Sequence, residues 1–329
     1  MTTTCNDWTM TWTSAAQAIY ALLPYTDKKE RYTLTDVMGV SGHAFRINIH
    51  PGDVNAAGPT MFDPEQLLED GLHLLGFATE PLHGFSTPAT PEQLREAIEF
   101  AQASIDRGLP VIGWSLFVPE FGLIYGYDDE KQELYCRDPR QDGALPYTKL
   151  NELPMKFVYM LRVTDSHDVD PLEAWTKGLR SIIEFARGQA PSLSAEYKHG
   201  LAGYDAWMEA FRHRTVDPFG NAYNTAVVCC AREFGVRFLE SFPERWTGDS
   251  EREEALRRLG AEAAKHYGAV AEALRGLQRL FPFPQGGEPN DPASASEAEA
   301  LLKAAKAAEE QGVAALERMY EALTRECVS

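Results

Sequence analysis

Gly108-Leu109-Pro110-Val111-Ile112-Gly113-Trp114 leads into Phe121-Gly122-Leu123-Ile124-Tyr125-Gly126-Tyr127-Asp128-Asp129, and Tyr135-Cys136-Arg137-Asp138-Pro139 follows. Two short apolar runs, a Gly-Tyr-Asp-Asp turn and a third run ending in Asp-Pro stand in succession, with Gly or Pro at each boundary. This order is typical of antiparallel strands joined by short turns. We therefore predict a β-meander over residues 108–139.

Helices are expected on the N-terminal side of this meander. Apolar residues recur at helical spacing in residues 12–23, 64–75 and 91–107, and a short helical turn is expected at 35–38. Residues 44–49 alternate like a strand. Helices followed by an antiparallel sheet indicate an α+β fold.

The composition changes near residue 165, where Ala/Glu/Leu/Arg-rich segments begin. We predict two domains, 1–165 and 166–329, the second an all-α helical bundle. Its helices are expected over residues 171–187, 200–212, 222–242, 250–280 and 296–325. Asn221 and Asn224 are expected to cap the third of these helices, or else to reach across the domain interface. Ser296 with Glu299 is expected to form a capping box on the last.

Charge and composition limit the partners. The chain has 329 residues and a net charge of −18, without a concentrated basic patch, so we expect binding neither to nucleic acid nor to membranes. The first seven residues lack the basic start and apolar core of a signal peptide, which predicts a cytoplasmic protein. Five scattered cysteines predict reduced thiols and no zinc site. We expect no cofactor, and a small molecule or a protein as partner.

Two segments carry a family resemblance. The Gly126-Tyr127-Asp128 strand, with Asp138-Pro139 ending the next strand, resembles the C39-like branch of the papain-like cysteine peptidases. Met38-Gly39-Val40-Ser41-Gly42-His43-Ala44-Phe45-Arg46 resembles the N-terminal domain of the butirosin-biosynthesis H-type acyltransferases. The resemblance covers roughly the first half of the chain. It implies a papain-like fold in which a Cys–His pair, oriented by an Asp, transfers an acyl group from a thioester to an amine.

The chain departs from this family pattern at two of three positions. The nucleophilic Cys falls at Trp12 and the base His at Glu120, while Asp138 keeps the position that orients the base. Tryptophan is no nucleophile, and a carboxylate in place of the imidazole would repel a thiolate. The resemblance therefore implies a catalytically degenerate protein. The alternative is a cysteine-dependent acyltransferase or amide hydrolase that uses Cys5, or else Thr13 or Ser14, with His43 or His50 as base.

Further residues are candidates for ligand binding. Arg46 and His50 share one face of the predicted strand and could bind a carboxylate or amine, or could instead brace the loop over 51–59. His43 and His50 fall on opposite faces, which argues against a shared metal site. Aromatic side chains near Glu120 could form a pocket for an apolar or cationic ligand, or could simply fill a disused site. The predicted ligand-binding set is Trp12, Ser14, Arg46, His50, Trp114, Glu120 and Tyr127.

The sequence thus favours a protein that binds a small amine- or acyl-bearing ligand, or a protein partner, in a cleft covered by the helical domain. The enzyme described above is the alternative. A structural role in a biosynthetic assembly is a third hypothesis, compatible with the acidic helical half.

Overall fold

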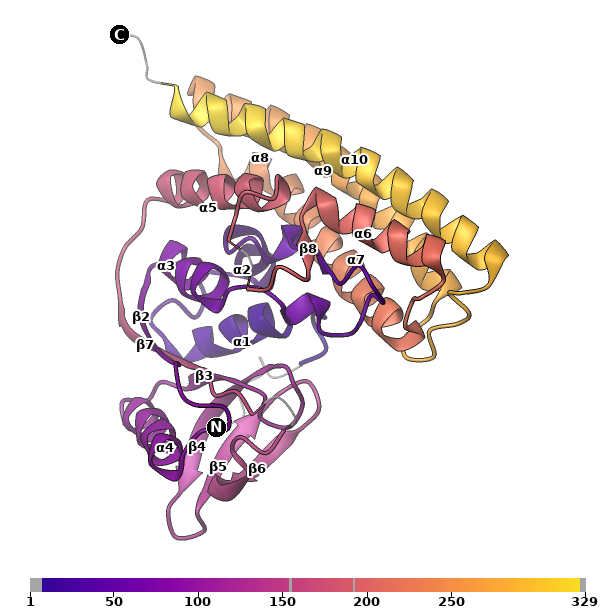
Figure 1. The fold of residues 1–329 in the computed structure, drawn as a ribbon. Coiled ribbons are helices and arrows are strands. Elements are labelled where there is room, and N and C mark those ends of the chain that lie inside the picture. The colour runs from indigo at the N-terminus through magenta and orange to yellow at the C-terminus, as the bar shows by residue number, and fades with distance from the viewer. Residues whose placement is uncertain (1–7, 154–155, 192, 326–329) are drawn as a thin grey trace. The chain divides into compact units, whose positions relative to one another are not determined.

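The computed structural model describes residues 8–153, 156–191 and 193–325 (Figure 1). The chain is of mixed α/β type and divides into two compact units. We call Met1–Val37 with Leu68–Val169 the sheet unit, and Met38–Leu67 with Asp170–Ser329 the helical unit. Each is described by itself.

The sheet unit is built on a six-stranded antiparallel sheet. Its strand order is β2-β7-β3-β4-β5-β6. The strands are β2 (Phe77–Leu82), β3 (Val111–Trp114), β4 (Phe121–Asp128), β5 (Glu133–Arg137), β6 (Asp142–Pro146) and β7 (Met160–Ser166).

The predicted meander is confirmed as β3, β4 and β5. Gly113 pairs with Gly122 across the first hairpin, and Gly126 pairs with Tyr135 across the second. The predicted Gly-Tyr-Asp-Asp turn lies mostly within β4, which runs through Asp128. Two further strands lie outside the meander on its β3 side, because β7 pairs with β3 and β2 pairs with β7.

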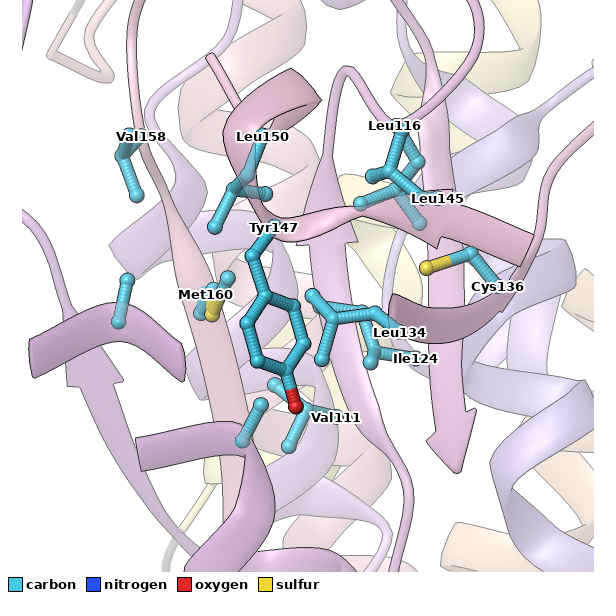
Figure 2. Close-up of a cluster of buried hydrophobic side chains, with 12 residues drawn as sticks. Val111, Leu116, Ile124, Leu134, Cys136, Leu145, Tyr147, Leu150, Val158 and Met160 are labelled. Carbon is cyan, nitrogen blue, oxygen red and sulfur yellow. The ribbon is translucent and has the colours of Figure 1, made fainter. Parts of the chain in front are cut away.

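Both faces of this sheet are covered. Val111, Ile124 and Leu134 belong to one buried cluster, whereas Ile112 and Leu123, which alternate with them, are buried as well. Helix α4 (Pro91–Ile105) contributes Ala97 and Ala101 to the first cluster, ten of whose members are labelled in Figure 2. The full cluster is Ala97, Ala101, Val111, Leu116, Ile124, Leu134, Cys136, Leu145, Tyr147, Leu150, Val158 and Met160.

The predicted N-terminal helices form, with shifted bounds. Helix α1 (Ser14–Leu22) packs against β3 and β4, and a 3₁₀ turn, Leu23–Tyr25, follows it. Helix α2 spans Leu34–Val40. The third predicted helix divides into a π-helical segment, Glu65–Glu69, and α3 (Asp70–Leu74). The predicted strand over 44–49 is mostly wrong: a 3₁₀ turn, His43–Phe45, precedes the two-residue strand β1 (Asn48–Ile49).

Five long helices lie in the described residues of the helical unit. They are α5 (Pro171–Ala186), α6 (Leu201–His213), α7 (Pro218–Glu240), α9 (Glu251–Leu280) and α10 (Pro292–Thr324), with the short α8 (Phe242–Arg245) after α7. Helices α9 and α10 lie side by side along their length (Figure 1). Strand β8 (Lys198–His199) pairs with β1.

The compact units differ from the predicted domains in residues 38–67, which pack with the helices. The cause is a buried ion pair between Arg232 of α7 and Glu309 of α10, whose Nη2 and Oε1 atoms lie 2.6 Å apart. Arg232 Nη1 also donates to the carbonyls of Ala44 and Arg46, at 3.0 Å each. The ring of Phe45 packs edge-on against Tyr267 of α9. These contacts fix the segment within the helical unit.

Two predicted helix caps are wrong. Asp217 caps α7, because its side chain accepts from the Gly220 amide at 2.6 Å, so Asn221 and Asn224 lie inside the helix. Asp291 caps α10 by accepting from the Ala293 and Ser294 amides, which places Ser296 within the helix. In both cases an Asp-Pro pair begins the helix earlier than the apolar periodicity indicated.

Candidate functional site

The start of α1 brings together a hydroxyl and a carboxylate. Ser14, the first residue of the helix, is buried, and its Oγ donates to Oε2 of Glu120. The Phe121 amide at the beginning of β4 donates to the same Oγ at 3.2 Å. The structure therefore brings two of the predicted ligand-binding residues, Ser14 and Glu120, into contact. Trp12, which the family resemblance places at the nucleophile position, lies two residues before Ser14.

Glu120 is positioned by the loop that joins β3 to β4. The Ser115 amide donates to the Glu120 carbonyl at 2.9 Å, and the Glu120 amide donates to the Val118 carbonyl at 2.7 Å. Ser115 begins this loop with φ at +62°, in the left-handed region that non-glycine residues seldom adopt. These backbone contacts fix the main chain at Glu120, and so the point from which its side chain extends.

Asp138 stabilises the same loop between β3 and β4. It is buried, and its Oδ2 accepts from the Phe117 and Val118 amides at 2.8 and 2.9 Å. Its Oδ1 accepts from the Arg140 amide at 2.9 Å and from the Gln141 amide at 3.3 Å. Both oxygens are thus engaged by backbone amides, so the aspartate braces the loop that carries Glu120.

Several buried polar atoms next to Ser14 have no hydrogen-bond partner. Gln17 lies one turn further along α1 and is completely buried, yet neither its Oε1 nor its Nε2 is paired. Thr13 Oγ1, immediately before the helix, is unpaired as well. Native structures leave few such groups, and each costs about 1–3 kcal/mol of stability. Their concentration at the start of α1 marks this place as polar and incompletely satisfied.

The predicted aromatic residues are in different surroundings. Trp114 is buried, and its ring lies 4.8 Å from that of Phe121. Trp12 is 42 % exposed. The Tyr127 hydroxyl donates to Asp106 at 2.8 Å, and its ring packs on the cluster beneath α4. These contacts give Tyr127 a structural setting away from the start of α1.

The predicted residues Arg46, His43 and His50 belong to the helical unit. The His43 Nδ1 atom lies 2.6 Å from Ser41 Oγ, and complete burial lowers the pKa of His43 to about 3, with a further contribution from the charge of Arg46. The His50 Nδ1 atom lies 2.7 Å from Asp53 Oδ1. The Arg46 guanidinium stacks on the Phe185 ring at 4.1 Å. The His50 contact corresponds to the alternative in which this residue braces the loop over 51–59.

The cysteines offer no thiolate at the start of α1 among residues 8–325 that are described. Cys5 lies outside the described residues. Burial raises the pKa of Cys136 far above its ordinary value, and raises that of Cys229 to about 12. Both thiols are therefore protonated and shielded from substrate.

Sequence reasoning named Ser14 and Glu120 separately but missed their pairing, because they are 106 positions apart. It also missed Gln17, whose place on the buried face of α1 resembles that of an apolar core residue. The polar type of this residue at an apolar position was the one signal available.

No group of three or more His, Cys, Asp or Glu side chains is arranged to hold a metal ion within the part of the chain that is described. None of the helices described is both long and apolar enough to span a membrane. Neither a known protein-family model nor a curated protein sequence matches the chain.

Proposed function

We propose that the chain binds a small amine-bearing molecule at the start of α1, with Glu120 as the counter-charge. The observation that carries this proposal is the Ser14–Glu120 pair together with the unpaired Gln17 amide one helical turn away. A carboxylate attracts an ammonium group, and an amide offers both a donor and an acceptor to the rest of a polar ligand. This is the binding half of the expectation drawn from the C39-like and butirosin-H resemblance.

The residues at this place suit binding better than cysteine catalysis. A carboxylate beside a thiol would raise the thiol pKa, whereas the imidazole of a Cys–His pair stabilises the thiolate. The positive end of a helix dipole favours negative charge, so a carboxylate at the start of α1 is stabilised there. The first effect disfavours a thiolate beside Glu120, and the second favours a carboxylate at this place.

Titration with n-butylamine and 1,4-diaminobutane, followed by calorimetry, tests the proposal, with 1-butanol as the neutral control. We expect Glu120→Gln to weaken amine binding at least about tenfold, or roughly 1.4 kcal/mol, because the charge is lost while an acceptor for Ser14 is kept. Glu152→Gln, which removes an exposed carboxylate paired with Lys149, is the matched control and should change nothing. Equal binding of the amines to wild type and Glu120→Gln would contradict the proposal.

A second function is favoured by the same hydrogen bond. Ser14 donates its proton to a carboxylate, as a serine nucleophile would to a general base. With p-nitrophenyl acetate, Ser14 Oγ would bond to the acetyl carbon, Glu120 would take the hydroxyl proton, and p-nitrophenolate would leave. A carboxylate is a weaker base toward a serine hydroxyl than the imidazole of a Ser–His pair, so we rank this function second.

Intact-mass measurement distinguishes the two functions. An acetyl adduct that appears on wild type and is absent from Ser14→Ala would establish the serine reaction. An adduct that persists in Ser14→Ala but disappears in Cys5→Ala would instead support the cysteine-dependent alternative. No adduct on any of the three proteins, together with amine binding that depends on Glu120, is the result expected from a binding protein.

A further inference from the structure

The end of α3 and the end of β7 are joined through the backbone of Gly76. This residue lies in the turn between α3 and β2 with φ at +86°, a conformation that suits glycine. Its amide donates to the His73 carbonyl at 2.9 Å, and its carbonyl accepts from the His167 amide at 2.9 Å. His73 belongs to the last turn of α3, and His167 directly follows β7. A single residue therefore holds the main chains of two histidines next to each other.

The side chains of these two histidines meet at the surface of the sheet unit. Their ring centres lie 5.2 Å apart, and the ring planes are inclined by 46°. Both residues are exposed, and neither imidazole forms a hydrogen bond or an ion pair within the part of the chain that is described. Their ring nitrogens are therefore available to a ligand from solvent.

Other histidines of the chain differ from this pair. A ring nitrogen of His43 lies against Ser41, that of His50 against Asp53, and that of His213 against Glu209. Over residues 8–153, 156–191 and 193–325, His73 and His167 are the one pair of histidines in ring contact. Two imidazoles with no protein hydrogen bond, side by side on anchored backbone, form an arrangement that can chelate.

A metal ion that binds imidazole nitrogen fits the spacing of the rings. Zinc binds a histidine nitrogen at about 2.0–2.1 Å, so two rings that ligate it at the tetrahedral angle have their centres roughly 5 Å apart. Because both side chains are exposed, each can turn about its side-chain torsions until one nitrogen faces the ion. Imidazole suits Zn²⁺, Ni²⁺ and Cu²⁺, whereas Mg²⁺ and Ca²⁺ prefer oxygen ligands.

The charges near the pair leave room for a cation. Lys28 Nζ donates to the His167 carbonyl, and Arg31 is paired with Asp168, with 3.4 Å between Nη1 and Oδ1. Asp27 lies on the same segment, because its Oδ2 accepts from the hydroxyl of the residue before His167 at 2.8 Å. Two carboxylates thus accompany two cationic groups, and the net charge of the chain, −18, favours the approach of a cation.

We propose that His73 and His167 bind one divalent transition-metal ion of the zinc class through one nitrogen each. No third His, Cys, Asp or Glu side chain completes a metal-binding group with them in the described ranges, so water occupies the remaining positions and the ion exchanges with solvent. The bound ion ties α3 to the end of β7 and stabilises the folded chain, because the unfolded chain does not hold the two imidazoles together. The site does not depend on the amine site proposed at Glu120.

Calorimetric titration with ZnCl₂, with MgCl₂ as the control for a cation that prefers oxygen, tests the proposal. We expect Zn²⁺ to bind in a saturable way and Mg²⁺ not to bind at the two histidines. In protein labelled with ¹³C-histidine, Zn²⁺ should shift the ring signals of His73 and His167, which the variants His73→Gln and His167→Gln identify.

The variants also test whether the two side chains act together. Each single substitution should weaken this binding at least about tenfold, because only one imidazole ligand remains. The double variant should add little to either single loss. His83→Gln is the matched control, because it changes an exposed histidine of the same unit whose ring stacks on Tyr159, and it should change nothing. Glu120→Gln should bind Zn²⁺ as wild type does, which separates this proposal from that of the amine site.

The proposal is overturned if Zn²⁺ leaves the ring signals of His73 and His167 unchanged, or if both single variants bind Zn²⁺ as wild type does. Zinc held elsewhere on the chain would give the second result. Losses that add in the double variant would also overturn the proposal, because the two histidines would then bind ions independently.

Discussion

The network around Arg232 in the helical unit and the start of α1 in the sheet unit both bury polar groups, but those of the first are paired, whereas several of the second are not. In the helical unit, Arg232 donates to both oxygens of Glu309 and to two backbone carbonyls, and the Tyr204 hydroxyl donates to Glu309 at 2.5 Å. In the sheet unit, the amide of Gln17 and the hydroxyl of Ser115 have no partner. A fully paired network stabilises one packing arrangement, whereas unpaired groups have capacity left for a ligand. The comparison concerns these two places alone, because the helical unit also contains unpaired buried polar atoms, among them Asn221 Nδ2 and His199 Nε2.

Breaking the paired network around Arg232 and Glu309 should have the largest effect on the free energy of unfolding. Burial alone would lower the pKa of the Arg232 guanidinium, but the charge of Glu309 holds it above its ordinary value, so Arg232 stays charged. We expect Glu309→Gln to lower the free energy of unfolding by about 3–5 kcal/mol, because it leaves a buried cation without its counter-charge. Chemical denaturation measures this loss.

The surface ion pair of Arg187 with Glu317 provides the control. Glu317→Gln removes one partner of a bidentate pair on the surface of the same unit, where water screens the charges. We expect it to cost at most about 1 kcal/mol. Equal losses for Glu309→Gln and Glu317→Gln would mean that the buried network does not stabilise the helical unit.

His43 gives the helical unit a stability that depends on pH. Its pKa of about 3 in the folded state lies below the ordinary histidine value, so between these values the unfolded chain binds the additional proton. Stability from this residue is complete above roughly pH 6.5 and is lost as the pH falls toward 3, by about 1.4 kcal/mol per pH unit. Denaturation at several pH values should show this slope. His43→Gln should flatten it, and His213→Gln, which changes an exposed histidine, should not.

In the sheet unit, Asp138 should stabilise the loop before Glu120. Asp138→Ala removes the acceptor of the Phe117 and Val118 amides, and we expect a loss of about 1–3 kcal/mol with faster hydrogen exchange of both amides. Asp128→Ala, which removes a similar contact to the Glu130 and Lys131 amides in an exposed turn, should cost less. Unchanged exchange in Asp138→Ala would show that this loop holds its shape by other means.

The smallest expected change in the free energy of unfolding is an increase, and it should follow the replacement of Gln17. Gln17→Met removes an unpaired buried amide at nearly constant volume, so we expect the free energy of unfolding to rise by about 1 kcal/mol while amine binding weakens. Gln102→Met is the matched change, because the Gln102 amide donates to Asp129 and to Tyr147. It should destabilise the protein by about 1 kcal/mol. Destabilisation by both changes would show that the Gln17 amide stabilises the folded protein.

The sequence was informative where structure depends on neighbouring residues. Gly and Pro around alternating apolar residues predicted β3, β4 and β5, and helical spacing predicted the long helices of the second half. These patterns are local, so one chain segment is enough to see them. The predicted bounds were less accurate, as Asp217 and Asp291 show, because a cap depends on a single side chain and not on a repeat.

The sequence was uninformative where structure depends on distant partners. The packing of residues 38–67 with the helices follows from Arg232 and Glu309, which look like ordinary charged residues in α7 and α10. The partnership of Ser14 with Glu120 joins residues far apart in the chain, and a resemblance that expected cysteine directed attention to Trp12.

The chain passes repeatedly between its two units, and this affects any attempt to express one unit alone. The backbone passes from one unit to the other after Val37, after Leu67 and after Val169. A fragment ending near residue 165 would carry Phe45, Ile47 and Ile49 without the helices that bury them, and would therefore invite aggregation. A fragment starting there would lose the partner strand of β8 and both carbonyls that receive Arg232. Recombination or gene fusion near residue 165 would therefore destabilise both units. We expect the two units to be inherited together.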